Sequence, residues 1–153
     1  MRDAPSYRIW PPIALGVPLG IGLGLTAAGY DPVALPKAAA AVIGWVLIVC
    51  FGFWNGWALI LMARHETALL PGGSTRTILD RGPFRASRNP LYLGLIALTA
   101  GVALVVPSFW GLIGVPVGAG LLWWGAIVSE ERYLDAKFGE QYRQYRTRVR
   151  RWL

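Results

Sequence analysis

The chain alternates between long uncharged stretches and short segments that carry all of its charges. No Lys, Arg, Asp or Glu occurs within residues 9–30, 38–63 or 89–129. Each stretch meets or exceeds the roughly 20 apolar residues that a helix needs to cross a hydrocarbon core of about 30 Å. The third stretch is long enough for two helices that turn at Pro107-Ser108. The pattern predicts an all-α integral membrane protein with four transmembrane helices, over residues 9–30, 37–63, 90–106 and 109–129.

Two polar segments remain outside the predicted spans, a loop over residues 64–89 and a tail over residues 130–153. With so little chain outside lipid, residues 1–153 form a single membrane domain. Apolar residues recur in the tail every three or four positions, which predicts an amphipathic helix that is interrupted or bent at Gly139. Such a tail is either an anchor at the membrane interface or a lid packed over the loop. Its stripe consists of Leu134, Phe138, Tyr142, Tyr145, Val149 and Trp152.

Glycines recur every fourth residue in three of the spans, a spacing that lets helix backbones approach closely in lipid. We expect these glycines to form the contacts between helices. Asn55 is the one strongly polar side chain deep in the second span. It bonds to a neighbouring helix or lines a substrate cavity, and the sequence leaves both open. The glycines are Gly16, Gly20 and Gly24 in the first span, Gly52 and Gly56 in the second, and Gly114 and Gly118 in the fourth.

The net charge of +7 is unevenly distributed. Basic residues are in excess before the first span, in the loop and in the tail, whereas the connector that holds Asp31 and Lys37 is neutral. The positive-inside rule therefore predicts a cytoplasmic membrane with the N-terminus, the loop and the tail in the cytosol. The charge is accounted for by orientation and by contact with membrane lipids, so no nucleic-acid partner is expected. A single cysteine, Cys50, and a single histidine, His65, predict neither a disulfide nor a metal site.

The segment from Leu79 to Gly94, LDRGPFRASRNPLYLG, is unusually rich in residues that a membrane anchor does not need. It places three arginines around a Gly82-Pro83 turn, just before Asn89-Pro90 starts the third span. Pro at the first turn and Asn as N-cap suit a helix start, whose free N–H groups favour an anion. The segment therefore predicts a site for a carboxylate or phosphate at the membrane surface. Its arginines are Arg81, Arg85 and Arg88.

Glu130 and Glu131 are two adjacent acids at the membrane edge, where interfacial segments favour Lys, Arg and aromatic residues. They pair with the loop arginines or recognise a cationic ligand, since low dielectric strengthens such contacts. Arginines and a helix N-terminus on one side, with two acids on the other, would fit a zwitterionic ligand.

Two motifs of the C-terminal part resemble the membrane methyltransferases, the superfamily of isoprenylcysteine carboxyl methyltransferases and phospholipid N-methyltransferases. The first is Gly82-Pro83-Phe84-Arg85-x-Ser87-Arg88-Asn89-Pro90-Leu91-Tyr92-x-Gly94, and the second is Glu130-Glu131-x-x-Leu134-x-x-x-Phe138-Gly139-x-x-Tyr142-x-x-Tyr145. The resemblance covers about residues 62–153 and extends to small prokaryotic members through Thr67, Pro71, Ser74-Thr75 and Leu79. One departure concerns the substrate. The eukaryotic carboxyl methyltransferases carry an Arg one turn before the Glu pair, where this chain has Ala126.

The resemblance implies an S-adenosylmethionine-dependent enzyme that methylates a lipophilic acceptor at the membrane. It implies a cofactor site built from Gly82, Pro83, Arg88, Asn89, Pro90, Tyr92, Gly94, Glu130 and Glu131. A carboxylate acceptor needs no base, whereas an amine acceptor must lose a proton, for which Glu131, Tyr92 or His65 could serve. Three alternatives stay open: a phospholipid N-methyltransferase, an NADPH-dependent enzyme like the sterol reductases, and a four-helix interaction protein without activity.

Overall fold

The computed structural model of the chain describes residues 5–65, 75 and 77–153, and within them it contains helices and no strand. Thr67, Pro71 and Ser74 of the resemblance lie outside the described residues. The helices are α1 (Pro11–Ala27), α2 (Lys37–Arg64), α3 (Pro83–Ala86), α4 (Pro90–Val105), α5 (Phe109–Leu122), the π-helical turn η1 (Trp123–Ile127), α6 (Val128–Phe138) and α7 (Glu140–Arg148).

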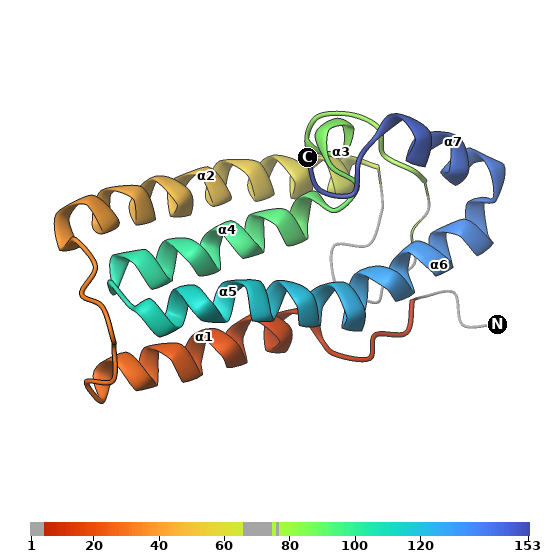
Figure 1. Cartoon of the computed structure of the whole chain (residues 1–153). Helices are drawn as coiled ribbons and strands as arrows, with labels where there is room; N and C mark the ends of the chain where they lie inside the picture. Colours follow the sequence, from red (N-terminus) through yellow and green to blue (C-terminus); the bar gives the residue numbers. More distant parts are fainter. Residues whose placement is uncertain (1–4, 66–74, 76) are drawn as a thin grey trace.

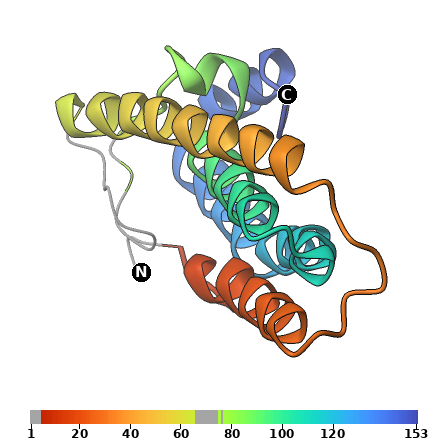
Figure 2. The same cartoon turned by 90° about the vertical axis from the view of Figure 1, so that its left-hand side faces the viewer.

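Four long helices lie side by side in the spatial order α1, α5, α4, α2 (Figures 1 and 2). The connector 28–36 runs from α1 at one edge of this row to α2 at the other. The predicted turn at Pro107-Ser108 separates α4 from α5, and Ser108 Oγ caps α5 by accepting from Gly111 N at 2.7 Å. The sequence thus located all four long helices, and the ends of the first three differ from the predicted ones by a few residues.

Small residues form the helix contacts, but several are not the predicted ones. A Cβ on Gly114 would lie 2.7 Å from Pro18 O, and one on Gly44 would lie 2.7 Å from Gly101 O, so these pairs of backbones touch. The prediction is right for Gly114 and Gly118. It is wrong within this chain for the glycines of the first two spans, because nothing lies within 4 Å of a Cβ placed on them. Those outward-facing glycines are Gly16, Gly20, Gly24, Gly52 and Gly56.

Two of the helices are long and apolar enough to cross a membrane. They are α2 and the unbroken helix Phe109–Phe138, which comprises α5, η1 and α6, whereas α1 and α4 are apolar but shorter. The large hydrophobic side chains of α2 are mostly exposed, Phe53 by 79%. An apolar surface of that extent suits contact with lipid rather than water.

The fourth long helix does not end at residue 129 as predicted. It continues through η1 into α6 and stops at Gly139, whose φ of +50° ends one helix and allows α7 to begin in a new direction. The predicted bend at Gly139 is therefore confirmed. Residues 5–10 run alongside η1, where Arg8 N donates to Gly125 O at 2.8 Å.

Candidate functional site

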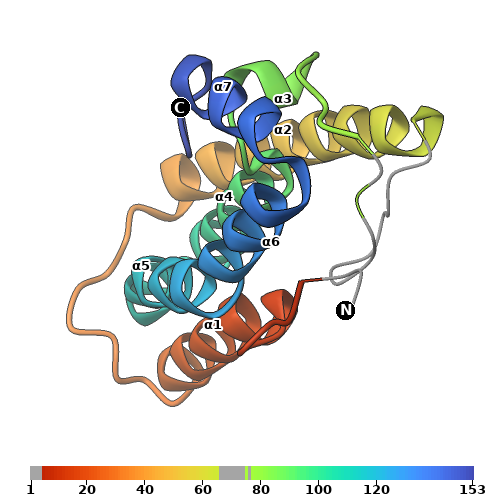
Figure 3. The ribbon, with the colours of Figure 1, turned by 90° about the vertical axis from the view of Figure 1, so that its right-hand side faces the viewer.

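A small cavity lies at the end of the bundle where α3, α6 and α7 meet. Figure 3 shows the arrangement of these helices from that end. Its volume is about 80 Å³. The walls combine the last turn of α2, residues 75 and 77–79 of the loop, α3, α6 and α7, and most of the lining side chains are apolar. The lining residues are Met62, Thr75, Thr77, Ile78, Leu79, Phe84, Arg88, Glu130, Leu134, Tyr142 and Tyr145.

The charged group beside this cavity is a carboxylate held by two arginines. Arg88 Nη1 lies 3.2 Å from Glu131 Oε1, and the two side chains are 10% and 11% exposed. Arg151 donates from Nε to Glu131 Oε1 at 2.9 Å and from Nη2 to Oε2 at 2.8 Å. This hydrogen bonding raises the pKa of the Arg151 guanidinium. The opposite charges predicted to converge do so, and Glu131 takes the pairing alternative of the two that the sequence left open.

The polar residues of the Arg-Asn-Pro motif hold the end of the chain in place. Arg88 N donates to Arg150 O at 2.9 Å. Ser87 Oγ and the Asn89 amide both donate to Arg151 O, at 3.1 and 3.2 Å. Asn89 occupies the N-cap position of α4, but its side chain makes no capping hydrogen bond because it is directed to Arg151. The motif therefore positions Arg151, which in turn binds Glu131.

Glu130 belongs to a second group of side chains. Tyr92 donates from its hydroxyl to Glu130 Oε2 at 2.7 Å, and the Tyr7 hydroxyl lies 3.4 Å from the same oxygen. The two tyrosine hydroxyls are 3.3 Å apart. Three segments distant in the chain thus meet at one carboxylate, which also lines the cavity. Neighbouring acids of one helix consequently have different partners.

Two observations bear on what the cavity could bind. Within the described part of the chain, two buried guanidinium atoms of Arg88 lack a hydrogen-bond partner: Nε, and Nη1, which forms the ion pair with Glu131. Buried donors are usually satisfied, so these atoms have capacity left for a ligand. Tyr145, which also lines the cavity, donates to Phe84 O at 2.6 Å and fastens α7 to α3. Burial raises the pKa of the Tyr145 hydroxyl, so it remains a neutral donor.

The other predicted site residues are distributed around this centre. Gly82 has a φ of +54°, and a Cβ there would lie 2.8 Å from Leu61, so the turn needs glycine. Pro83 and Pro90 are buried at the starts of α3 and α4. Gly94 lies against Asn55 between α4 and α2 instead of lining the cavity.

Two further polar residues lie in α2 or directly after it. His65 is exposed at the end of α2, with Nδ1 2.8 Å from Leu61 O, and it does not line the cavity. Asn55 donates to Leu91 O at 3.2 Å, as expected for a residue that bonds a neighbouring helix. Within the described residues, no three His, Cys, Asp or Glu side chains gather as metal ligands would.

Sequence reasoning missed three residues of the site: Arg151, Tyr7 and Ser87. Arg151 is one of many basic residues in the tail, and nothing in its spacing separates it from the others. Tyr7 lies far from both motifs in the chain and carries no local signal. Ser87 stands inside the first motif, and its small polar side chain among arginines was the one available indication.

The fold and site define a helical membrane protein with a charged cavity at one end of the bundle. The chain matches the phospholipid methyltransferase family over residues 39–141, and it belongs to that family. It is also 35% identical over 63 residues to an uncharacterized protein of Haemophilus influenzae, a match that spans 41% of this chain and all of that protein. No solved structure matches the chain. The family assigns the chain to the membrane methyltransferases, as the motifs predicted.

Proposed function

We propose that the protein transfers a methyl group from S-adenosylmethionine to a lipophilic acceptor at the membrane. The observation that carries the proposal is the buried guanidinium of Arg88, whose Nε has no hydrogen-bond partner beside a cavity that Glu130 also lines. A cation and an anion on the walls of one cavity match the carboxylate and ammonium of an amino acid. The family membership independently supports methyl transfer.

The residues present fit the amino-acid end of the cofactor. Arg88 Nε would donate a charge-assisted hydrogen bond to its carboxylate, and Glu130 would receive its ammonium. Ligands with a nucleoside need pockets of roughly 300 Å³ or more, whereas this cavity has about 80 Å³. Binding of the whole cofactor therefore requires α7 and the segment 77–80 to separate.

The cofactor supplies a methyl group already activated by a sulfonium, so the chain has to align the reactants and exclude water. Glu131 keeps Arg88 and Arg151 in place on one side. If the acceptor is an amine, the Tyr92–Glu130 pair is the group best arranged to take its proton, because a carboxylate accepts the phenol's hydrogen bond at 2.7 Å. His65 does not line the cavity, so we assign it no part in this step.

An apolar groove supports a lipophilic acceptor. It has a volume of about 580 Å³ and lies between α2 and α4, with Trp54 and Trp57 on one side and Leu93 and Ala97 on the other. Leu153, the last residue of the segment that the motif anchors, lines the same groove. A hydrocarbon chain lying there would come from the bilayer, and the methyl donor would come from the cytosol. This arrangement requires all four long helices to span the membrane, with the loop and tail on the cytosolic side.

The acceptor class follows from Ala126, which is fully buried in η1 and packs in one cluster with Tyr92 and Leu122. No arginine stands there to orient a carboxylate. We therefore favour an amine or hydroxyl acceptor, such as a phospholipid headgroup amine, over a prenylcysteine carboxylate.

The test is a binding titration of the purified full chain in detergent with S-adenosylmethionine, its demethylated product and NADPH. We expect saturable binding of the first two, weakened at least about tenfold by Arg88→Gln. Arg85→Gln removes the same charge three residues away at an exposed position and should leave binding unchanged. Preference for NADPH would favour the reductase-like alternative, and binding of none of the three would favour an interaction protein without activity. Labelled cofactor added to membranes should then yield a methylated lipid.

A further inference from the structure

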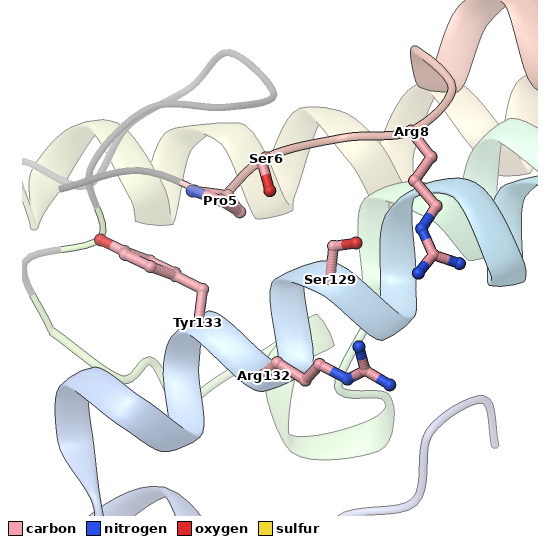
Figure 4. Close-up of a pocket in the computed structure, with 6 residues that line it drawn as sticks. All are labelled: Pro5, Ser6, Arg8, Ser129, Arg132 and Tyr133. Carbon is pink, nitrogen blue, oxygen red and sulfur yellow. The ribbon is translucent and has the colours of Figure 1, made fainter. Parts of the chain in front are cut away.

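A second, polar pocket lies between residues 5–8 and α6 (Figure 4). Its volume is about 360 Å³, and it shares no lining residue with the cavity beside Arg88. Residues 5–8, which form one wall of the pocket, lie outside the part of the chain that the family matches, whereas α6 lies within it. The pocket is lined by Pro5, Ser6, Arg8, Ser129, Arg132 and Tyr133.

The two charged members of the pocket are both cations. The guanidinium groups of Arg8 and Arg132 are directed into the same space, with the Ser129 hydroxyl nearby (Figure 4). Within the described residues, neither arginine forms an ion pair, although the guanidinium of Arg8 stacks 5.0 Å from the centre of the Trp124 ring. Two like charges facing one space repel each other, and an anion between them would remove that repulsion.

The backbone holds Arg8 in this position without help from its side chain. Arg8 N and Ile9 N both approach Gly125 O, at 2.8 and 3.4 Å. A Cβ on Gly125 would lie 2.8 Å from the Cβ of Ile9, so only glycine lets the segment lie this close. Gly125 belongs to the π-helical turn η1, a deviation that is frequent at functional sites. The backbone at Arg8 is thus fixed beside the pocket before any ligand arrives.

Aromatic residues indicate the depth of the pocket in the membrane. Trp10, Trp123 and Trp124 are exposed by 53%, 47% and 51%, and all three lie in or beside the segments that form the pocket. Tryptophan concentrates at the level of the lipid headgroups. An anion at this level is the phosphate of a lipid, and arginine matches phosphate oxygens in paired hydrogen bonds.

From these observations we propose that the pocket between residues 5–8 and α6 binds the phosphate of an anionic membrane lipid. Arg8 and Arg132 contact its oxygens, and the hydroxyls of Ser6 and Ser129 donate to the same group. Basic pockets at the membrane surface bind lipid headgroups in this way. The site does not depend on methyl transfer and would exist even if the proposed activity were wrong.

The experiment titrates the purified full chain in an uncharged detergent with dihexanoylphosphatidylglycerol, with neutral dihexanoylglycerol and with inorganic phosphate, followed by tryptophan fluorescence. We expect the anionic lipid to bind, and Arg8→Gln or Arg132→Gln to weaken its binding at least about tenfold. Arg148→Gln removes one charge from exposed α7 and should bind like the wild-type chain. Both pocket arginines are exposed, so circular dichroism should show that these variants fold.

Each of the other possible results either supports or overturns the anion site. Inorganic phosphate that binds as tightly as the lipid, with the same dependence on Arg8 and Arg132, would support the anion site and assign it to a soluble phosphate. Equal binding of the neutral diglyceride, or unchanged lipid affinity in both arginine variants, would overturn the proposal. Ser129→Ala gives a second measurement, because it removes one donor without altering charge and should weaken binding by a smaller factor.

Discussion

Arg151 donates two hydrogen bonds to the Glu131 carboxylate, at 2.9 and 2.8 Å, although the two residues lie 20 positions apart in the chain. These hydrogen bonds depend on the Arg-Asn-Pro motif, because the side chains of Ser87 and Asn89 donate to the backbone carbonyl of the same Arg151. A carboxylate on α6, a motif before α4 and the end of the chain therefore form one unit. The proposed ligand-binding capacity of Arg88 rests on this unit staying assembled.

Replacing Arg151 with Ala should therefore lower stability and weaken cofactor binding together. The paired hydrogen bonds of a partly exposed arginine are worth about 1–2 kcal/mol, so we expect a measurable fall in the midpoint of thermal unfolding in detergent. Arg150→Ala is the matched control, because it removes the neighbouring charge and keeps the backbone carbonyl that Arg88 uses. Equal unfolding midpoints for the two variants would show that the hydrogen bonds from Arg151 to Glu131 contribute nothing to stability.

Removing the Tyr92 hydroxyl should affect Glu130 more than removing that of Tyr7. Tyr92 donates at 2.7 Å, whereas Tyr7 lies 3.4 Å from the same oxygen. Leaving a buried acceptor without its donor costs about 1–3 kcal/mol, so Tyr92→Phe should destabilise the chain by an amount in that range. Tyr30→Phe removes a hydroxyl from a residue that is 68% exposed and serves as the control. Thermal unfolding of the three variants checks the order, and a larger effect from Tyr7→Phe would contradict it.

The candidate proton acceptors differ in position, so their variants should separate in activity. We expect His65→Ala to keep the methylation rate of the wild-type chain, because His65 is exposed and absent from the cavity wall. Glu130→Gln should lower the maximal rate with an amine acceptor at least about a hundredfold, the usual contribution of a general base. The measurement is transfer of a labelled methyl group into extracted lipid, with the unfolding midpoint of each variant recorded alongside. A slow His65→Ala enzyme together with a fast Glu130→Gln enzyme would reverse the assignment.

The sequence predicts the positions of the long helices better than it predicts the contacts between them. Uncharged runs locate each long helix because lipid imposes both length and composition. Glycine spacing alone could not indicate which face touches a neighbour. A Cβ on Gly22 would collide with the backbone of Trp110 and Gly111, whereas a Cβ on the regularly spaced Gly20 or Gly24 would meet nothing within 4 Å.

The site shows the same division. The motifs identified Arg88 and the Glu pair as candidate site residues, because opposite charges at a membrane edge need partners. Arg151 and Tyr7 could not be identified from the sequence, because only the folded chain brings them next to those acids. The separate roles of Glu130 and Glu131 follow from the rotation between successive residues of a helix, but the partners on each side could not be known in advance.

The contact between Gly94 and Asn55 gives a test of how α4 packs on α2. A Cβ at position 94 would collide with the Asn55 side-chain amide, so Gly94→Ala should cost at least about 2 kcal/mol of stability, as overpacking of a close contact usually does. Gly52→Ala meets no atom within 4 Å and should be neutral or stabilising, because alanine favours the helix by about 1 kcal/mol over glycine.

A double-mutant cycle makes the test specific. Once Asn55→Ala has removed the obstructing amide, the added methyl group of Gly94→Ala has room, so its cost should fall by more than half. Unfolding midpoints of the two single variants and the double variant in detergent give this coupling. Strict additivity of the two substitutions would mean that the helices do not meet at these residues.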